Sequence, residues 1–346
     1  MTASVHPANP SIADAAAAVS PLQALLQGAA FASLEETGWI KITGDDRVRW
    51  LNGMTTNSIQ QLQPGEGNYN LLLSAQGRIQ GDAYAFSLPD SLLLETGRAH
   101  IPVLMELLDR FIIMDDVLLE DISAERRGLL CAGPVAATCL AALGIETAPG
   151  DALQLRTISW RNFEVTLVSA YSPLVPRFEL WTDAAGVQAL AEALSTAGVR
   201  HLDAADGSDA LEQLRLLEGT PRYGVDIRER ELPQETGLTR ALHFAKGCYL
   251  GQEIVERIRS RGNVHRTFQA FLLRGELPAA SAALESEGKA VGELTSIASV
   301  PLASGTVQLA LGYIRREALD RGLTIHYSGG EATPVAFPFR DALRPG

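Results

Sequence analysis

Short segments that alternate apolar and polar residues follow one another with amphipathic segments along most of the chain. Alternation over residues 39–43 predicts a strand, and the apolar spacing over residues 48–54, directly after two aspartates, predicts a capped helix. Residues 68–86 predict two strands joined at a Gln-Gly turn, and residues 91–96 predict a third strand. Helical periodicity returns over residues 101–111. The first part of the chain is therefore expected to combine helices with a β-rich unit.

The middle of the chain repeats this mixture. Strands are predicted over residues 153–159, 163–169 and 177–181, and a helix over residues 184–196. Strands and helices mixed in this way favour an α+β fold. Neither GxGxxG after a strand nor GxxxxGK[ST] occurs in the sequence, which excludes the two commonest nucleotide-binding motifs.

The two ends of the chain differ from its middle. Residues 1–20 are rich in Ala and Pro and predict a mobile tail, which leads into a short helix over residues 22–31. A further helix is expected over residues 210–218, followed by a charged, turn-rich loop over residues 219–238. Beyond residue 262, short strands interrupted by Gly and Pro predict a small β-barrel. These strands are expected at residues 267–273, 289–296, 309–314 and 324–327.

Composition narrows the class of protein. A chain of 346 residues that is 46% hydrophobic has enough apolar material for two or three domain cores. Its three cysteines, Cys131, Cys139 and Cys248, form no CxxC pair, which argues against a disulfide scaffold or a zinc finger and favours a reducing compartment. Its six histidines are scattered, so we expect no metal site. No basic residue precedes Lys41 and no apolar run is long enough to cross a membrane, so we expect a cytoplasmic protein.

The charge distribution is uneven. The net charge of −12 argues against a general attraction to nucleic acid or to an anionic membrane. One segment, residues 240–266, nevertheless carries six basic residues against two acidic ones, and we call it the basic island. Its basic residues are Arg240, Lys246, Arg257, Arg259, Arg261 and Arg266. The island indicates an anionic ligand. An RNA-binding module is a weaker alternative, because aromatic residues are not interleaved with the arginines as base-stacking platforms require.

Within the basic island, residues 246–253 have the sequence Lys-Gly-Cys-Tyr-Leu-Gly-Gln-Glu. Apolar spacing after Gly251 predicts a helix that begins there, with Cys248 just upstream of its N-terminus. Amide groups at a helix end and the neighbouring Lys246 would both favour the thiolate form of Cys248. The alternative is that Cys248 is a small residue packed in a turn and that the arginines form a solvated helix face.

This segment resembles the signature K-G-C-Y-x-G-Q-E of the YgfZ-type folate-binding proteins, a branch of the glycine-cleavage T-protein (aminomethyltransferase) superfamily. The T-protein lacks the Lys-Gly-Cys-Tyr segment, so its presence favours the YgfZ branch. The likeness spans roughly residues 35 to 320. Other matching segments lie at residues 44–57, 214–216, 219–221, 223–224, 232–235, 262–266, 292–296 and 309–314.

The resemblance implies an α+β fold of three domains, which form a ring around a central opening that holds tetrahydrofolate, with a small β-barrel at the C-terminus. In this chain it implies a flexible tail and short helix at residues 1–30 and an α+β second domain at residues 117–200. The folate-binding core would be discontinuous, formed by residues 31–116 and 201–262, and the β-barrel would occupy residues 263–346.

The resemblance also implies site residues. Trp39 falls where YgfZ-type proteins place an aromatic side chain implicated in folate binding. Asp82 falls where the T-protein carries its catalytic aspartate, which can orient an amine or shuttle a proton near the folate N5 atom. A carboxylate at a turn or strand edge is the alternative for Asp82. The glutamate that the T-protein places against the pterin falls on Leu217, with Glu218 adjacent.

Taken together, we expect catalytic roles for Cys248 and Asp82, and no metal ligands. We expect folate contacts from Trp39, Asp82, Glu218, Tyr223, Lys246, Tyr249 and Arg257.

The function implied by the resemblance is that of a protein that binds tetrahydrofolate, or a one-carbon derivative of it, and supports iron–sulfur enzymes, including those that modify tRNA. Its partners would be folate and iron–sulfur client or assembly proteins, with no direct binding to nucleic acid or membrane. The alternative is an aminomethyltransferase that transfers a one-carbon unit to tetrahydrofolate, as the glycine-cleavage T-protein does.

Overall fold

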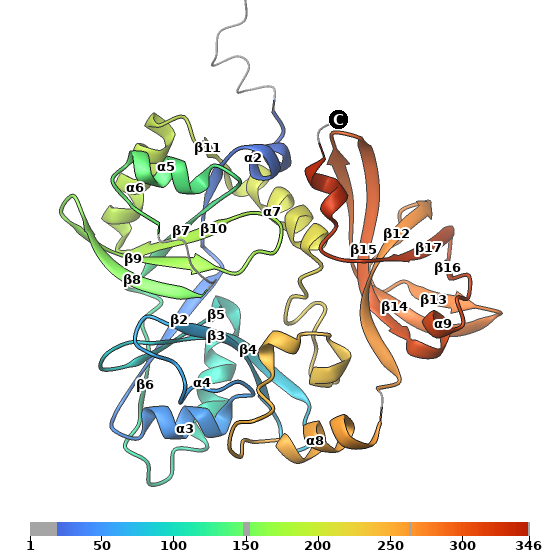
Figure 1. Ribbon diagram of the computed structural model, residues 1–346, viewed down its shortest axis with the longest axis horizontal. Helices are drawn as coiled ribbons and strands as arrows, with labels where there is room; N and C mark the ends of the chain where they lie inside the picture. The colour runs from blue at the N-terminus through green and yellow to red at the C-terminus, as the bar shows by residue number, and fades with distance from the viewer. Residues whose placement is uncertain (1–18, 148–152, 263, 345–346) are drawn as a thin grey trace, which may run out of the picture.

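Three β-sheets form the framework of the protein (Figure 1). The computed structural model describes residues 19–147, 153–262 and 264–344. Two of the sheets lie one above the other, and the third, a closed barrel, stands beside them (Figure 1). The helices are α2 (Pro21–Gln27), α3 (Arg47–Met54), α4 (Ile101–Asp109), α5 (Ala136–Ala142), α6 (Ala184–Thr196), α7 (Ala204–Glu218), α8 (Gln252–Arg261) and α9 (Arg316–Asp320). Short 3₁₀ helices are η1 (Arg98–His100), η2 (Pro233–Glu235), η3 (Thr239–Ala241) and η4 (Arg340–Leu343).

The first sheet has the strand order β3-β4-β5-β2-β6 and is antiparallel throughout. Its strands are β2 (Thr37–Thr43), β3 (Gly67–Leu73), β4 (Ile79–Ser87), β5 (Leu92–Gly97) and β6 (Leu118–Asp121). Helices α3 and α4 supply Leu51 and Leu104 to the apolar core on one of its faces, where they meet Ile40 and Leu94. The strand, helix and hairpin expected from alternation over residues 39–96 are confirmed.

The second sheet has the strand order β11-β1-β7-β10-β9-β8. Its strands are β1 (Ala30–Ser33), β7 (Arg127–Ala132), β8 (Gln154–Trp160), β9 (Phe163–Ala170), β10 (Arg177–Thr182) and β11 (Arg200–His201). Helices α5 and α6 pack against it. The helix expected over residues 22–31 is wrong beyond Gln27, because α2 ends at Gly28 and Phe31 is a fully buried member of β1. Strand β1 pairs with β7 and β11, both distant in sequence, so local periodicity gives no sign of it.

The third sheet is a closed barrel with the order β12-β15-β14-β13-β16-β17. Its strands are β12 (Arg266–Gly275), β13 (Ala283–Ser286), β14 (Lys289–Leu302), β15 (Gly305–Arg315), β16 (His326–Tyr327) and β17 (Gly330–Val335). The expected α+β fold and C-terminal β-barrel are therefore confirmed. The last expected strand, over residues 324–327, is shorter than predicted, and β13 and β17 were not foreseen.

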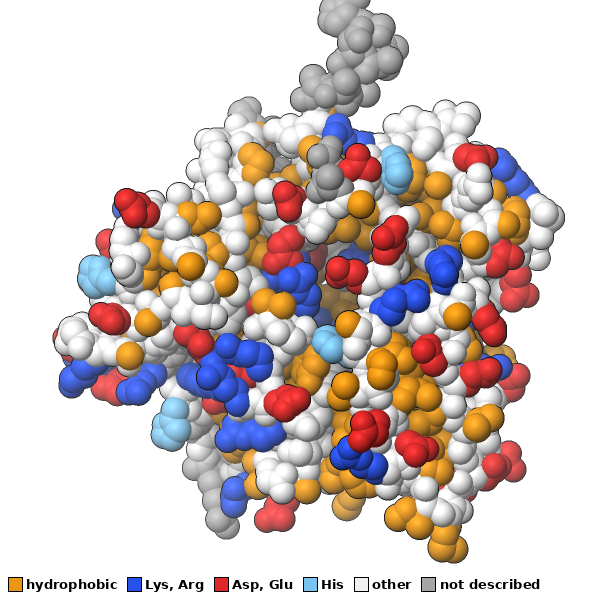
Figure 2. Space-filling model, turned by 180° about the vertical axis from the view of Figure 1, so that it is seen from behind, with side chains coloured by type: hydrophobic (Ala, Val, Ile, Leu, Met, Phe, Trp, Pro, Cys, Tyr) orange, Lys and Arg blue, Asp and Glu red, His pale blue; other side chains and the backbone are white. Residues whose placement is uncertain are grey.

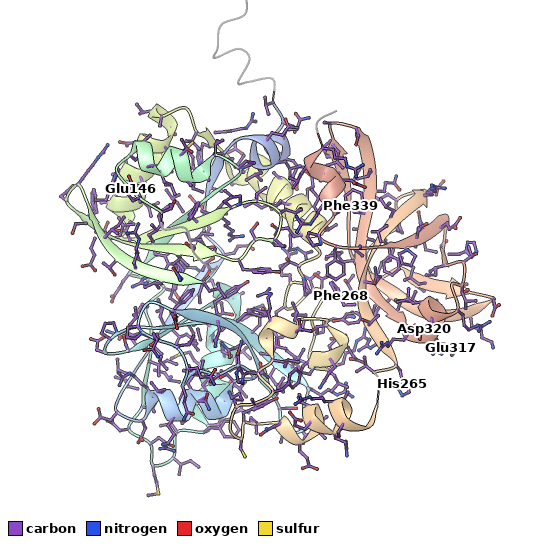
Figure 3. All side chains as sticks on the ribbon, viewed as in Figure 1. Glu146, His265, Phe268, Glu317, Asp320 and Phe339 are labelled. Atoms are coloured by element: carbon purple, nitrogen blue, oxygen red, sulfur yellow. The ribbon has the colours of Figure 1, made fainter. Side chains whose placement is uncertain are left out.

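One apolar core joins all three sheets. Trp39 of the first sheet, Trp181 of the second and Tyr313 of the barrel belong to it, together with Leu214 of α7. Figure 3 labels Phe268 and Phe339, which lie on the side of the barrel that faces α7, and the Phe339 backbone N–H donates to the carbonyl oxygen of Leu217 in α7 (2.7 Å). Helix α7 therefore stands where the three sheets meet.

The expected domain limits remain a prediction. Strand β1 lies in the second sheet although β2, which follows it, lies in the first, and β6 lies in the first sheet although β7, which follows it, lies in the second. The sheets therefore exchange strands near these limits. The tail expected at residues 1–20 lies outside the described residues up to position 18. None of the described helices combines the length and the apolar character needed to cross a membrane.

Two glycines bring α8 against the β3–β4 hairpin. Gly251, directly before α8, has a φ of +80°, and a Cβ placed there would stand 2.6 Å from the carbonyl oxygen of Ser74. Gly77, in the hairpin turn, has a φ of +72°, and a Cβ there would stand 2.7 Å from the side chain of Ile254. Only glycine fits both the backbone conformation and the space at these positions.

Replacing Gly251 by alanine is expected to lower the free energy of unfolding by about 1–3 kcal/mol, because the left-handed backbone and the contact with Ser74 both resist a Cβ. Denaturant unfolding monitored by circular dichroism measures the change. Gly247→Ala is the matched control, since a Cβ there meets nothing within 4 Å. It should be neutral or slightly stabilising. Equal stability of the two variants would contradict the tight packing of α8 on the hairpin.

Candidate functional site

Asp82 lies on the face of β4 that is turned away from the α3–α4 side of the sheet. Alternation places Asp82 and Tyr84 on this face and Ala83 on the other. The Tyr69 hydroxyl donates a hydrogen bond to Asp82 Oδ2 (2.6 Å). Burial raises the pKa of Asp82 above its ordinary value of 3.8, although the Tyr69 hydrogen bond and the nearby His100 act in the opposite direction. Asp82 is therefore a carboxyl group placed to hold or release a proton.

A cavity of about 300 Å³ opens beside Asp82 and brings it together with a second predicted residue, Tyr223. The Tyr223 hydroxyl donates to the carbonyl oxygen of Gln80 (2.6 Å), and its ring meets the ring of His100 edge to face at 4.9 Å. Burial raises the pKa of Tyr223 to about 12, so its hydroxyl remains a donor. The cavity therefore joins two carboxyl groups, Asp82 and Glu229, with His100, Arg228 and the phenol of Tyr223.

Three tyrosines surround the guanidinium of Arg240. Its central carbon lies 4.3 Å from the ring centre of Tyr69, 4.0 Å from that of Tyr171 and 5.8 Å from that of Tyr84. These distances are those of cation–π contacts. Because Tyr69 also bonds Asp82, Arg240 is one ring away from the Asp82 carboxyl group.

Glu218, the last residue of α7, lies near Arg177 and Arg240. Its neighbour Leu217 is fully buried in the apolar core shared by the three sheets. The Glu218 carboxylate accepts a hydrogen bond from the Ser172 hydroxyl. Burial raises the pKa of Glu218, while Ser172, Arg177 and Arg240 lower it. The structure therefore turns Leu217 into the core and Glu218 toward Arg240.

A second pair of carboxyl groups lies behind Tyr84. Glu179 is held by Arg177 (Nη2 to Oε1, 2.7 Å) and by the Trp181 ring N–H (3.1 Å). Burial, and then the adjacent Glu179, raise the pKa of Glu95 well above its ordinary value of 4.5. Glu95 therefore holds a proton more tightly than an ordinary carboxyl group does, while Glu179 is paired with Arg177.

These polar side chains are linked to one another through the contacts just described. We call Tyr69, Asp82, Tyr171, Glu218 and Arg240 the central cluster. Seen from behind, the molecule is hollowed near its centre, with hydrophobic side chains in the hollow and charged side chains of both signs around it (Figure 2).

Lys246 is buried beneath the segment that contains Cys248. Its ammonium group donates to the carbonyl oxygens of Asn52 (2.7 Å), Thr55 (2.6 Å) and Asn57 (2.5 Å) at the C-terminal end of α3. A cation at this end of a helix meets carbonyl groups that have no partner within the helix. Burial lowers the pKa of Lys246 to about 7.

Cys248 is exposed and lies three residues before Gly251. Contrary to the expectation from sequence, Lys246 is not directed at the sulfur, because all three of its N–H groups point at backbone oxygens. Tyr249 is buried instead, with its ring centre 5.1 Å from the Lys246 nitrogen. The segment is thus anchored by Lys246 and Tyr249, and it presents Cys248 to solvent.

The other two predicted folate contacts lie elsewhere. Trp39 has no exposed surface, and its ring packs edge to face against Trp181 at 5.6 Å. Arg257 is exposed on α8. The structure therefore brings together Asp82 and Tyr223, with Glu218 close by, and leaves Trp39 and Arg257 apart from them. The folate contacts of all these residues stay predictions.

Comparison with known proteins identifies the family. The model of the GCVT N-terminal domain matches residues 14–246, about two thirds of the chain. The chain belongs to the GCVT family. An aminomethyltransferase of Geobacillus kaustophilus is 27% identical over 315 residues, which cover 87% of this chain and 84% of that protein. A chloroplastic protein of Arabidopsis thaliana with the provisional name of transferase is 25% identical over 306 residues, covering 88% of this chain and 69% of that protein.

A solved structure shows the same fold. The crystal structure of the glycine cleavage system aminomethyltransferase T from Bartonella henselae matches with a TM-score of 0.80 at 21% identity. The match covers 92% of this chain and 88% of that one. At this level of identity the likeness concerns the fold, and the arrangement of two sheets and a barrel is thus that of a GCVT family member.

Several residues in or beside the central cluster were not predicted from the sequence. Tyr69, Tyr84 and Tyr171 received no role, and Arg240 was noted only for its charge. One signal was available, because Tyr84 stands two residues after Asp82 on an expected strand and so shares its face. The position of Tyr171 in a loop between β9 and β10 gave no comparable sign.

A further cavity, of about 530 Å³, lies at the opposite end of the barrel from η4 and includes none of the predicted residues. His265, Glu317 and Asp320 line it, and Figure 3 shows them together near the start of β12. Within the described ranges, no group of three or more His, Cys, Asp or Glu side chains is arranged to hold a metal ion.

Asp82→Asn is expected to make this GCVT family protein more stable at pH 7. A carboxyl group whose pKa is raised on folding binds protons more tightly in the folded state, so its effect on stability becomes less favourable as pH rises from 3.8 through the raised value. Asparagine removes this cost and can still accept the Tyr69 hydrogen bond. Denaturant unfolding across a pH series should show an advantage at pH 7 that fades below pH 3.8.

Asp46→Asn is the control, because the pKa of Asp46 is lowered and the substitution should therefore reduce stability at pH 7. Its backbone hydrogen bond with Asp116 and its pairing with Arg49 lower the pKa of Asp46, so its contribution is present above the ordinary pKa and is lost on acidification. A loss of stability in Asp82→Asn at pH 7 would contradict the burial cost assigned to Asp82.

Proposed function

We propose that this protein binds tetrahydrofolate, or a one-carbon derivative of it, at the central cluster. The observation that carries the proposal is the Tyr69–Asp82 pair, in which a buried carboxyl group opens onto a cavity and receives a phenolic hydrogen bond. The names of the related aminomethyltransferases give independent support, since aminomethyl transfer needs an acceptor of one-carbon units.

The side chains present suit a reduced folate. When bound, the pterin N5 atom can carry a one-carbon unit. Tyrosine rings offer apolar faces for a flat heterocycle, and the carboxyl groups of Asp82 and Glu218 can accept hydrogen bonds from ring N–H groups. A raised pKa brings Asp82 closer to the pH at which a single group both takes and returns a proton.

Within the superfamily, we place the protein in the YgfZ-like branch, as a cytoplasmic accessory protein that supports iron–sulfur enzymes, including those that modify tRNA. Residues 246–253 support this assignment because Lys246 and Tyr249 anchor the segment while the Cys248 thiol faces solvent. An exposed thiol on an anchored loop can reach a protein partner. Iron–sulfur client or assembly proteins are the partners we propose.

Cys248→Ala is expected to reduce the restored activity of iron–sulfur tRNA-modifying enzymes several-fold in a strain that lacks the endogenous protein, because the exposed thiol is lost. Levels of the modified nucleosides, measured by mass spectrometry, give the readout. Cys139→Ala is the matched control, since Cys139 packs beside the core of the second sheet. If Cys248→Ala restored the levels of modified nucleosides as fully as the wild type does, the Cys248 thiol would have no role in the proposed function.

An aminomethyltransferase is the second candidate, favoured by the names of the relatives and by the position of Asp82. It would transfer the one-carbon unit of a lipoyl-bound aminomethyl group to tetrahydrofolate. If so, methylene-tetrahydrofolate should form with lipoylated carrier protein, and Asp82→Asn should slow its formation by roughly 10²–10⁴-fold, the usual contribution of a general acid or base. A wild-type rate equal to background would eliminate this candidate.

A further inference from the structure

The structure separates the members of the basic island. Lys246 is bound to backbone oxygens, and Arg266 is paired with Glu235 (Nε to Oε1, 3.0 Å). Arg259 is paired with Glu256 on the helix surface (3.5 Å). The island is therefore not a single anion-binding surface, and its members must be considered one by one.

Arg240 is the member that lies in the central cluster. Its backbone is fixed, since the Asn57 side-chain amide donates to the Arg240 carbonyl oxygen (2.9 Å). Its guanidinium contacts the rings of Tyr69 and Tyr171, and Nη1 is buried with no hydrogen-bond acceptor among the described residues. A guanidinium has five N–H donors, and a buried donor without a partner is costly. Arg240 thus has donor capacity that the described part of the protein leaves unused.

Contacts on either side of Arg240 give the central cluster an order. On one side, Arg240 contacts Tyr69, whose hydroxyl bonds Asp82. On the other, it contacts Tyr171, whose neighbour Ser172 bonds Glu218. Consistent with this order, the positive charge of Arg240 acts to lower the pKa of both carboxyl groups. The cluster therefore presents a hydrogen-bond acceptor at Asp82, a donor at Arg240 and a second acceptor at Glu218, in that order.

One edge of a reduced pterin has the complementary order. Its N5–H is a donor, its 4-oxo oxygen is an acceptor, and its N3–H and 2-amino groups are donors. We propose that Arg240 donates to the 4-oxo oxygen of the bound pterin, and so makes the site selective for 4-oxo pterins over their 4-amino analogues. This inference rests on the proposed function. It adds a residue that determines ligand specificity. A 4-amino group is a hydrogen-bond donor, so it would face the N–H donors of Arg240 and neither group would have an acceptor.

The test compares tetrahydrofolate with tetrahydroaminopterin, which differs from it by a 4-amino group in place of the 4-oxo oxygen. Affinities are measured by calorimetry under anaerobic conditions with the full-length protein. The wild type should prefer tetrahydrofolate by about 100-fold or more, since a site built to bond a polar group rejects an analogue that leaves its own groups unpaired.

Arg240→Gln should weaken tetrahydrofolate binding by about 10- to 100-fold and strengthen binding of the 4-amino analogue, because a glutamine amide can turn to accept as well as donate. A gain in affinity for the analogue is not expected from structural damage. Arg240→Lys keeps only donors and should retain the preference for tetrahydrofolate. Arg321→Gln, an exposed surface variant, should bind both ligands as the wild type does.

The possible outcomes separate this inference from the proposed function. If the wild type binds tetrahydrofolate and Arg240→Gln leaves the ratio of the two affinities unchanged, the role of Arg240 is wrong while folate binding stands. A preference that is lost equally in Arg240→Lys and Arg240→Gln also overturns the role. If the wild type binds neither ligand, the proposed function fails, and this inference fails with it.

Discussion

Packing of helix α7 against the two open sheets and the barrel is the contact on which the rest of the structure depends. Leu214 and Leu217 enter the apolar core that also contains Trp39, Trp181 and Tyr313. Burial of large side chains from three separate sheets in one place holds the sheets in a fixed relation, because interiors of this kind are closely packed. The next residue of the helix, Glu218, then emerges on the side of the central cluster.

The central cluster is built under a second constraint, which is that buried charges require partners. Arg177 pairs with Glu179, and burial beside Glu179 raises the pKa of Glu95. Arg240 meets tyrosine rings in place of a carboxylate. The result is a set of hydrogen-bond donors and acceptors held between the first sheet, the loop after β9 and the end of α7. A site of this type suits a polar, flat ligand.

Sequence patterns predicted much of the fold and a smaller share of the site. Residues 39–43 were found because their alternation is local, and the barrel because its short strands and turns recur. Phe31 was assigned to a helix because the strands that flank it in the sheet lie far along the chain. The same limit applies to Lys246, whose acceptor Thr55 lies 191 residues earlier. Resemblance found Asp82 and Cys248, but only the structure orders Tyr69, Arg240 and Glu218 around a common point.

The anchoring of Lys246 has a consequence for the chemistry of the loop. Residues 246 to 248 carry two nucleophiles, and the fold conceals one while it offers the other. Amine-directed reagents are kept from a nitrogen enclosed by backbone oxygens, whereas alkylating agents, oxidants and thiol-bearing partners reach the sulfur freely. Because Lys246 is held by backbone oxygens and Cys248 is exposed, a modification of the sulfur need not disturb the contacts that anchor the loop.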